Sequence, residues 1–70
     1  MPYVNIKITP EGATPEKKAE LIAGVTDLLQ RSLNKNPATT HVVIEVVELE
    51  DWGLGGLPVE QFRQQAAARE

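Results

Sequence analysis

The chain has 70 residues, no cysteine, and seven Lys and Arg against ten Asp and Glu, which gives a net charge of −3. This length allows one domain over residues 1–70, and the lack of cysteine excludes disulfides and thiolate metal sites. The acidic balance disfavours nucleic acid as a partner, and no apolar run reaches the roughly 20 residues that span a bilayer. We expect no metal or other cofactor, and a cysteine-free chain without an apolar leader fits the cytoplasm.

The first predicted element is a strand over residues 3–9. Val4, Ile6 and Ile8 alternate there with polar or amphipathic side chains, a period of two that is typical of a half-buried strand. Residues 10–12 end this strand, because proline lacks the N–H that a sheet needs and glycine suits a turn.

A long amphipathic helix is predicted to start at Thr14-Pro15 and to run to about Asn34. Threonine is a favoured N-cap, and proline suits the first helical position, where its missing N–H has no partner to lose. At ~100° per residue the large apolar side chains fall in one stripe roughly 140° wide, which predicts a face that covers a sheet. These side chains are Leu21, Ile22, Val25, Leu28, Leu29 and Leu33.

Residues 41–49 form the most β-branched segment of the chain and predict a second strand. A helix between two strands implies a right-handed β-α-β crossover with parallel strands. Both faces of this second strand are largely apolar, so we expect the helix on one face and another subunit on the other. Self-association would also stabilise so small a chain.

The segment 52–57 predicts a hairpin or a bulged ribbon, because glycines alternate there with large apolar residues. The polar, alanine-rich tail of residues 59–70 has Phe62 as its only large apolar side chain, and it predicts either a short helix or a frayed end. The expected fold class is therefore α+β: a β-α-β subunit with one long helix and a C-terminal hairpin, assembling into oligomers.

Pro2 is the first candidate for a catalytic residue, because the usual nucleophile, metal and phosphate-loop motifs are missing. Removal of Met1 would leave its nitrogen as a secondary amine. An α-amino group has a pKa near ~8, which desolvation or nearby positive charge lowers. A neutral amine is a competent general base or nucleophile. A Met-Pro start also occurs in proteins without this chemistry.

Three segments resemble the 4-oxalocrotonate tautomerase family: M-P-Y-V-N-I-K-I at the start, E-G-x-T before the long helix, and W-G-L-G-G after the second strand. Their order and spacing extend the resemblance from Pro2 to about Val59. It implies β-α-β subunits that join their sheets in pairs, with three pairs forming a homohexamer. It also implies an isomerase in which Pro2 moves a proton within an enol or unsaturated keto acid, without a cofactor.

The resemblance further places Trp52 in an aromatic wall of the active site, where an apolar surface would favour the neutral amine. A tryptophan packed at a subunit interface fits the same position. The two substrate-binding arginines of the family are missing, since their positions fall at Ala13 and His41. His41 could bind a carboxylate or polarise a carbonyl, with a charge that depends on pH, or be a polar residue at the mouth of a strand. Lys7 and Arg31 lie on polar faces and are set aside.

Two other functions stay open from the sequence. Glu45 shares a strand face with His41, and a carboxylate there could activate water, as a hydratase or dehalogenase acting through Pro2 requires. A solvated or interface-paired charge is the simpler role for Glu45. The missing arginines also agree with an oligomeric homologue without catalysis. Among substrates, they favour a monoacid or a less charged enol over a dicarboxylate.

Overall fold

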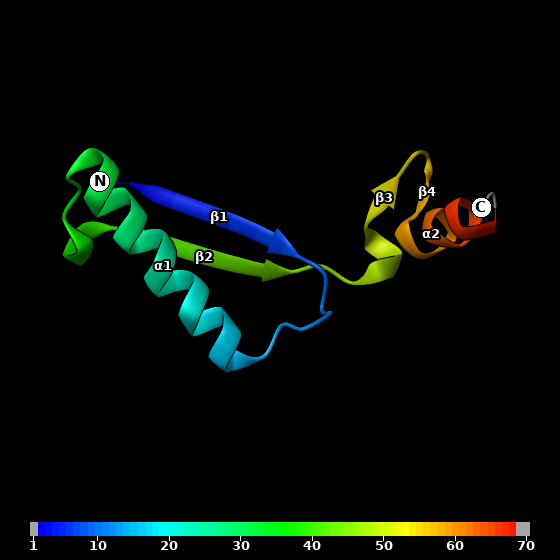
Figure 1. Cartoon of the computed structure of the whole chain (residues 1–70), viewed down its shortest axis with the longest axis horizontal. Coiled ribbons are helices and arrows are strands. Elements are labelled where there is room, and N and C mark those ends of the chain that lie inside the picture. The colour runs from blue at the N-terminus through cyan, green and yellow to red at the C-terminus, as the bar shows by residue number, and fades with distance from the viewer. Residues whose placement is uncertain (1, 69–70) are drawn as a thin grey trace.

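In the computed structural model, which describes residues 2–68, the chain forms a β-α-β unit followed by a small hairpin and a second helix (Figure 1). In chain order, the helices and strands are β1 (Tyr3–Ile8), α1 (Pro15–Leu33), β2 (His41–Val46), β3 (Gly53–Leu54), β4 (Leu57–Pro58) and α2 (Val59–Ala68). Short 3-10 turns at Pro37–Thr39 and Leu49–Asp51 flank β2. The expected α+β class and the β-α-β subunit are confirmed. Met1 and the last two residues of the predicted tail lie outside the described residues.

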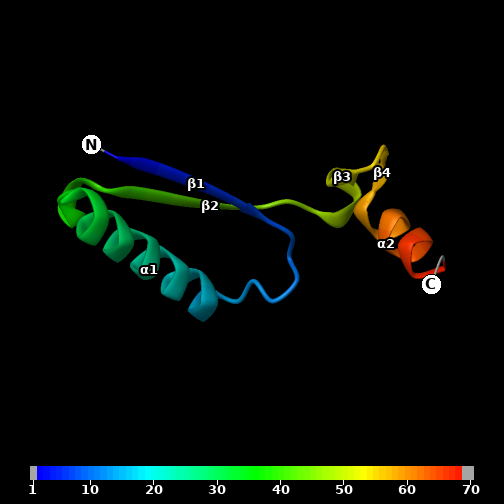
Figure 2. The same cartoon turned by 45° about the horizontal axis from the view of Figure 1, so that its top comes forward.

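Strands β1 and β2 pair in parallel, with a register that runs from Tyr3 opposite His41 to Ile8 opposite Val46. This register gives both strands the same alternation, so most of their apolar side chains share one face of the sheet, while Val43 lies on the other face and is 40% exposed. Helix α1 lies along the shared face, as Figure 2 shows from the side. The apolar side chains that share it are Val4, Ile6, Ile8, Val42, Ile44 and Val46.

The second strand is shorter than the sequence predicts. It ends at Val46 rather than Leu49, because β1 offers no partner beyond Ile8. The last bond of the ladder runs from the Val47 N–H to the Ile8 carbonyl oxygen at 2.7 Å, and the chain then turns at Leu49–Asp51. The first strand likewise ends at Ile8 instead of Thr9.

Helix α1 has the predicted start, because Thr14 is its N-cap and accepts a hydrogen bond from the Lys17 backbone N–H at 3.2 Å. The Asn34 N–H still bonds the Gln30 carbonyl oxygen at 2.9 Å, and the helix ends there because Asn34 adopts a left-handed conformation with φ 54°. This conformation turns the next N–H, that of Lys35, back to the Leu29 carbonyl oxygen at 3.4 Å. A left-handed cap of this kind satisfies the last carbonyls of a helix. Capping at both ends therefore fixes the length of α1.

The C-terminal part is a hairpin with α2 packed against it. Gly55 and Gly56 form the turn with positive φ angles of 63° and 84°, a conformation that glycine adopts without strain. The Phe62 ring lies over this turn, so close that a Cβ on Gly55 would come within 2.9 Å of it. Val59 is the buried residue of this part, and its N–H donates to the Trp52 carbonyl oxygen at 2.8 Å. The predicted hairpin is confirmed, and the tail forms a helix.

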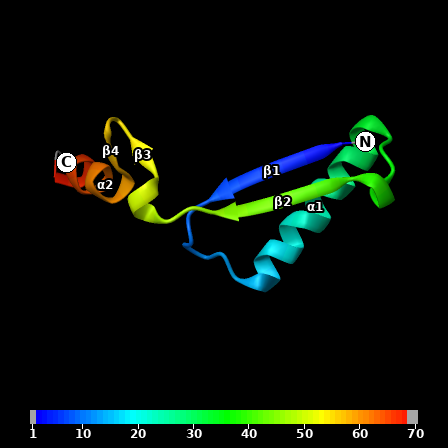
Figure 3. The same ribbon diagram turned by 180° about the vertical axis from the view of Figure 1, so that it is seen from behind.

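The protomer is extended, and its hairpin and α2 project beyond the end of the sheet (Figure 1). Its radius of gyration is 16.0 Å, whereas a compact domain of this length has one of about 11 Å. Leu33 and Leu28 on α1 remain 61% and 49% exposed, and Leu54 on the hairpin 47%. Figure 3 shows the sheet from behind, where no described element covers it. The apolar surface of one protomer is thus only partly covered by its own chain.

None of the helices in the described part of the chain is long and apolar enough to cross a membrane.

Candidate active site

The structure brings Pro2 and His41 together at one end of the sheet. Pro2 comes directly before β1, and its carbonyl oxygen accepts a hydrogen bond from the His41 backbone N–H at 3.0 Å. Pro2 is half-buried and His41 is exposed. This proximity follows from the parallel register, which places Tyr3 opposite His41 and so aligns the beginnings of the two strands.

Trp52, the third predicted site residue, lies beyond the other end of the sheet. It is half-buried and follows the turn Leu49–Asp51, after β2 has ended. Six residues of β1 separate the two ends, and at ~3.3 Å per residue this distance is roughly 20 Å. Figure 3 shows the beginning of β1 and the hairpin at opposite ends of the sheet. Within one protomer, Trp52 therefore does not reach Pro2.

Trp52 lines a cavity of about 600 Å³, which we call the Trp52 pocket. The pocket lies between the loop after β1, the first turns of α1 and the C-terminal part. Trp52, Leu54 and Val59 contribute apolar surface, and Lys18 and Arg63 contribute positive charge. The pocket therefore combines an aromatic wall with cationic groups, a combination that suits a small organic anion.

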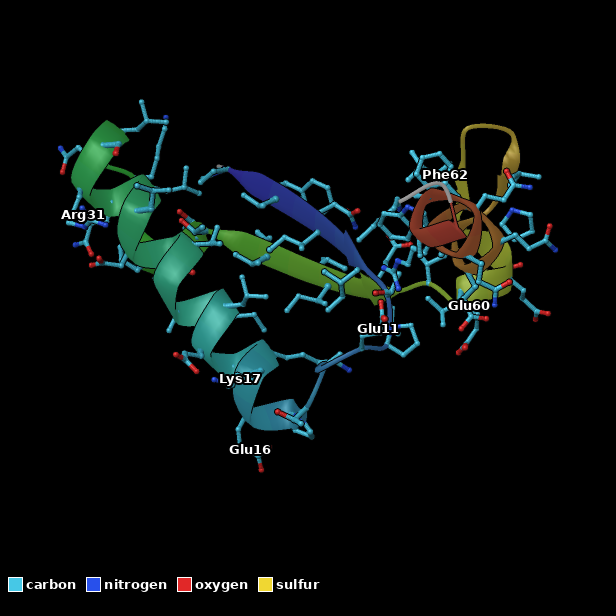
Figure 4. All side chains as sticks on the ribbon, turned by 45° about the vertical axis from the view of Figure 1, so that its right-hand side comes forward. Glu11, Glu16, Lys17, Arg31, Glu60 and Phe62 are labelled. Atoms are coloured by element: carbon cyan, nitrogen blue, oxygen red, sulfur yellow. The ribbon has the colours of Figure 1, made fainter. Side chains whose placement is uncertain are left out.

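An ion pair between Glu11 and Arg63 holds α2 against the loop after β1. The Arg63 Nη1 and Nη2 atoms donate to the two carboxylate oxygens of Glu11 at 2.8 and 3.1 Å. The Thr9 hydroxyl also donates to Glu11, at 2.8 Å. These hydrogen bonds, with Arg63 first, lower the pKa of Glu11, and the same pair raises the pKa of Arg63. Figure 4 shows Glu11 at the end of the sheet that faces α2.

Glu45 is engaged by its neighbours on the uncovered face of the sheet. The Asn5 amide donates to it at 2.6 Å, and the Lys7 ammonium lies 3.0 Å away. The hydrogen bonds from Lys7 and then from Asn5 lower the pKa of Glu45. A carboxylate with a lowered pKa is a weaker base, so this environment favours the paired-charge role of Glu45 over water activation.

The sequence did not identify Arg63 and Glu11 as site residues. Their ion pair joins positions 52 residues apart, so no local spacing reveals it. Lys7, set aside as a residue of a polar face, also lines the Trp52 pocket. Arg31 pairs with Asp27 at 2.7 Å, and Figure 4 shows it at the end of α1 away from the pocket.

No cluster of three or more His, Asp or Glu side chains that could hold a metal ion occurs among residues 2–68.

The family model of the tautomerase enzymes matches residues 2–61. The chain belongs to the tautomerase family. A probable tautomerase K2 of Dickeya dadantii (strain 3937) is 58% identical over 67 residues, which cover 96% of this chain and 100% of the relative. A probable tautomerase of Helicobacter pylori (strain 26695) is 48% identical over 66 residues, 91% of this chain and 97% of the relative.

Solved structures agree with this assignment. DmpI from Helicobacter pylori matches with a TM-score of 0.82 and 47% identity, over 86% of this chain and 98% of that one. A heterohexamer 4-oxalocrotonate tautomerase from Chloroflexus aurantiacus matches with a TM-score of 0.79 and 25% identity, over 90% and 100%. The resemblance to the 4-oxalocrotonate tautomerase family is confirmed, and this membership indicates an enzyme of the tautomerase type.

Proposed function

We propose that the protein is a cofactor-free isomerase that moves a proton within an enol or unsaturated keto acid. The secondary amine of Pro2, exposed once Met1 is removed, is the general base. The observation that carries this proposal is the family match, which begins at residue 2 and so includes the proline itself. Pro2 is also half-buried, and partial desolvation favours the neutral amine.

The proposed reaction needs one proton carrier. The neutral Pro2 amine takes a proton from the enol hydroxyl, the electrons shift along the conjugated system, and the protonated amine returns the proton to a carbon. No atom is gained or lost, so no co-reactant is required. A positioned general base contributes typically about 10²–10⁴-fold to the rate.

We propose that two protomers complete each site. Pro2 and His41 come from one protomer and Trp52 from another, because one chain holds Pro2 and Trp52 at opposite ends of its sheet (Figure 1). In this arrangement His41 binds or polarises the substrate, and Trp52 forms the apolar wall.

The assembly that we propose is a cytoplasmic homohexamer of three dimers. The extended protomer supports self-association, since α1 and the hairpin leave large apolar side chains exposed. The Chloroflexus neighbour is described as a heterohexamer, which agrees with six subunits in this fold.

The test compares mature protein that starts at Pro2 with a form in which an N-terminal extension keeps the same nitrogen as an amide. Intact mass confirms each form, and absorbance follows tautomerisation of phenylenolpyruvate and 2-hydroxymuconate. We expect kcat/KM of the extended form to fall by about 10² or more. Equal turnover by the two forms would show that Pro2 is not the base, and inactivity of both would favour a non-catalytic homologue.

A further inference from the structure

Charged side chains are unevenly distributed between the two ends of the protomer. Residues 28–44 contain no carboxylate, whereas residues 46–62 contain four carboxylates and no cation. The first segment ends α1 and leads into β2, so it lies at the end of the sheet where β1 begins (Figure 1). The second segment forms the hairpin and the start of α2, which project beyond the other end. The protomer is therefore polarised in charge along its longest axis, which spans 47 Å.

The projecting part of the chain, residues 48–68, combines exposed apolar surface with negative charge, and we call it the arm. Leu54 on the hairpin remains 47% exposed, and Trp52 is half-buried. The four residues before Trp52 include three exposed carboxylates, those of Glu48, Glu50 and Asp51. The ion pairs between described residues use none of these three. The arm thus presents apolar side chains beside negative charge that its own protomer does not compensate.

The opposite surface, which we call the Pro2 end, combines exposed apolar side chains with positive charge. Tyr3 at the start of β1 is 65% exposed, and Leu33 at the end of α1 is also exposed. Lys35 is exposed in the connection between α1 and β2, and no ion pair between described residues uses it. Arg31 is compensated within α1 by Asp27. Lys35 therefore supplies the net positive charge of this end.

These two surfaces match in charge and in apolar character, but they lie at opposite ends of one chain and cannot meet within it. We propose that the arm of one protomer docks on the Pro2 end of a second copy. Trp52 and Leu54 then lie against apolar side chains of the second copy, and the three carboxylates of the arm face its Lys35. Apolar burial provides most of the affinity, and the opposite charges select this end of the second copy.

The occupant is a second copy because one chain carries both halves of the match. A contact between two different surfaces is heterologous, and it closes into a ring when the rotation between neighbouring subunits allows it. The proposal rests on the proposed function in one respect, since this contact would bring Trp52 of one protomer to Pro2 of another.

A double-mutant cycle on assembly tests the charge match. One variant neutralises the arm by Glu48→Gln, Glu50→Gln and Asp51→Asn together, and the other is Lys35→Gln. Sedimentation velocity over a range of concentrations gives the midpoint of assembly for wild type, each variant and their combination. We expect Lys35→Gln to raise this midpoint by about fivefold when the arm is intact and to leave it unchanged when the arm is neutral. Equal effects of Lys35→Gln in the two backgrounds would overturn the proposal.

The matched control is Lys17→Gln, which removes the same charge from the other end of α1. Lys17 is exposed there and lies 3.7 Å from Glu20 (Figure 4). This change should act equally on assembly whether the arm is intact or neutral. Coupling to the arm as large as that of Lys35 would mean that only overall charge matters, and it would overturn the choice of the Pro2 end. Circular dichroism confirms that these exposed substitutions leave the secondary structure intact.

A spin label shows where the arm docks. The chain has no cysteine and one tryptophan, so an introduced cysteine carries the label and the Trp52 indole N–H resonance reports on the arm. Chains labelled at Ser32→Cys, in the last turn of α1, are refolded together with nitrogen-15 chains that carry no label, so broadening arises only between protomers. We expect stronger broadening of Trp52 from this position than from Glu16→Cys, at the start of α1 (Figure 4). Equal broadening, or the reverse order, would refute the docking position.

These measurements need no enzyme activity, so failure of this inference is distinguishable from failure of the proposed function. The two protein forms that start at Pro2 or carry the N-terminal extension are assayed in parallel with phenylenolpyruvate. An active tautomerase in which the arm and Lys35 are not coupled would refute this inference alone. A protein that shows the coupling and the broadening but no tautomerase activity would refute the proposed function alone and leave the contact between protomers.

Discussion

Mixing two differently damaged chains tests whether each site is shared between protomers. The first chain carries an N-terminal extension that converts the Pro2 nitrogen to an amide, and the second carries Trp52→Ala. Roughly 20 Å of strand separates these two positions within one chain. Each pure oligomer therefore has every site damaged, whichever protomers contribute to the site.

The structure gives definite expectations for the mixed oligomers. If Pro2 and Trp52 of a site come from different protomers, random 1:1 assembly leaves about a quarter of the sites intact. If both came from the same protomer, no site would be intact. A chain with both changes, mixed 1:1 with wild type, should retain about a quarter of the wild-type activity for shared sites and about half for unshared ones.

The assay is phenylenolpyruvate tautomerisation after joint unfolding and refolding, with native mass spectrometry to verify that mixed oligomers have formed. The extension gives the two chains different masses, so their ratio in each oligomer can be read directly. Activity that stays at the level of the two pure variants, in oligomers shown to be mixed, would refute the shared site. Dissociation of the Trp52→Ala oligomer would show that Trp52 acts at the interface.

Two further predictions concern stability, measured by urea unfolding at one fixed protein concentration. Gly56→Ala should lower the free energy of unfolding by about 1–2 kcal/mol because of its positive φ alone. Gly55→Ala should lower it more, because the new Cβ would also lie 2.9 Å from the Phe62 ring. Equal losses in the two variants would contradict the packing of Phe62 on the turn. Because Arg63 and Thr9 lower the pKa of Glu11, the pair stabilises the protein above the ordinary pKa of 4.5, and this contribution disappears as the pH falls through the lowered pKa. The urea midpoint of wild type should therefore drop more between about pH 6 and pH 3 than that of Glu11→Gln, and parallel curves would contradict this sign.

Most of the secondary structure could be predicted from the sequence because it depends on neighbours along the chain. The alternation of Val4, Ile6 and Ile8 predicts β1, and Thr14 with Pro15 predicts the start of α1, since both signals act within a few residues. The end of β2 could not be predicted in this way. Val47 continues the β-branched pattern, but a strand ends where its partner ends. The last pair joins Val46 to Ile8, which lies 38 residues earlier in the chain.

The candidate site, too, could be predicted from the sequence only in part. The sequence identified Pro2, Trp52 and His41 through short motifs and their resemblance to a family, and their roles and the single domain remain predictions. Only the tertiary structure placed Pro2 beside His41 and away from Trp52, because the parallel register aligns the beginnings of the strands and leaves Trp52 beyond their ends. It alone also joined Glu11 to Arg63, since an ion pair between side chains 52 residues apart depends on the path of the whole chain and on no local pattern.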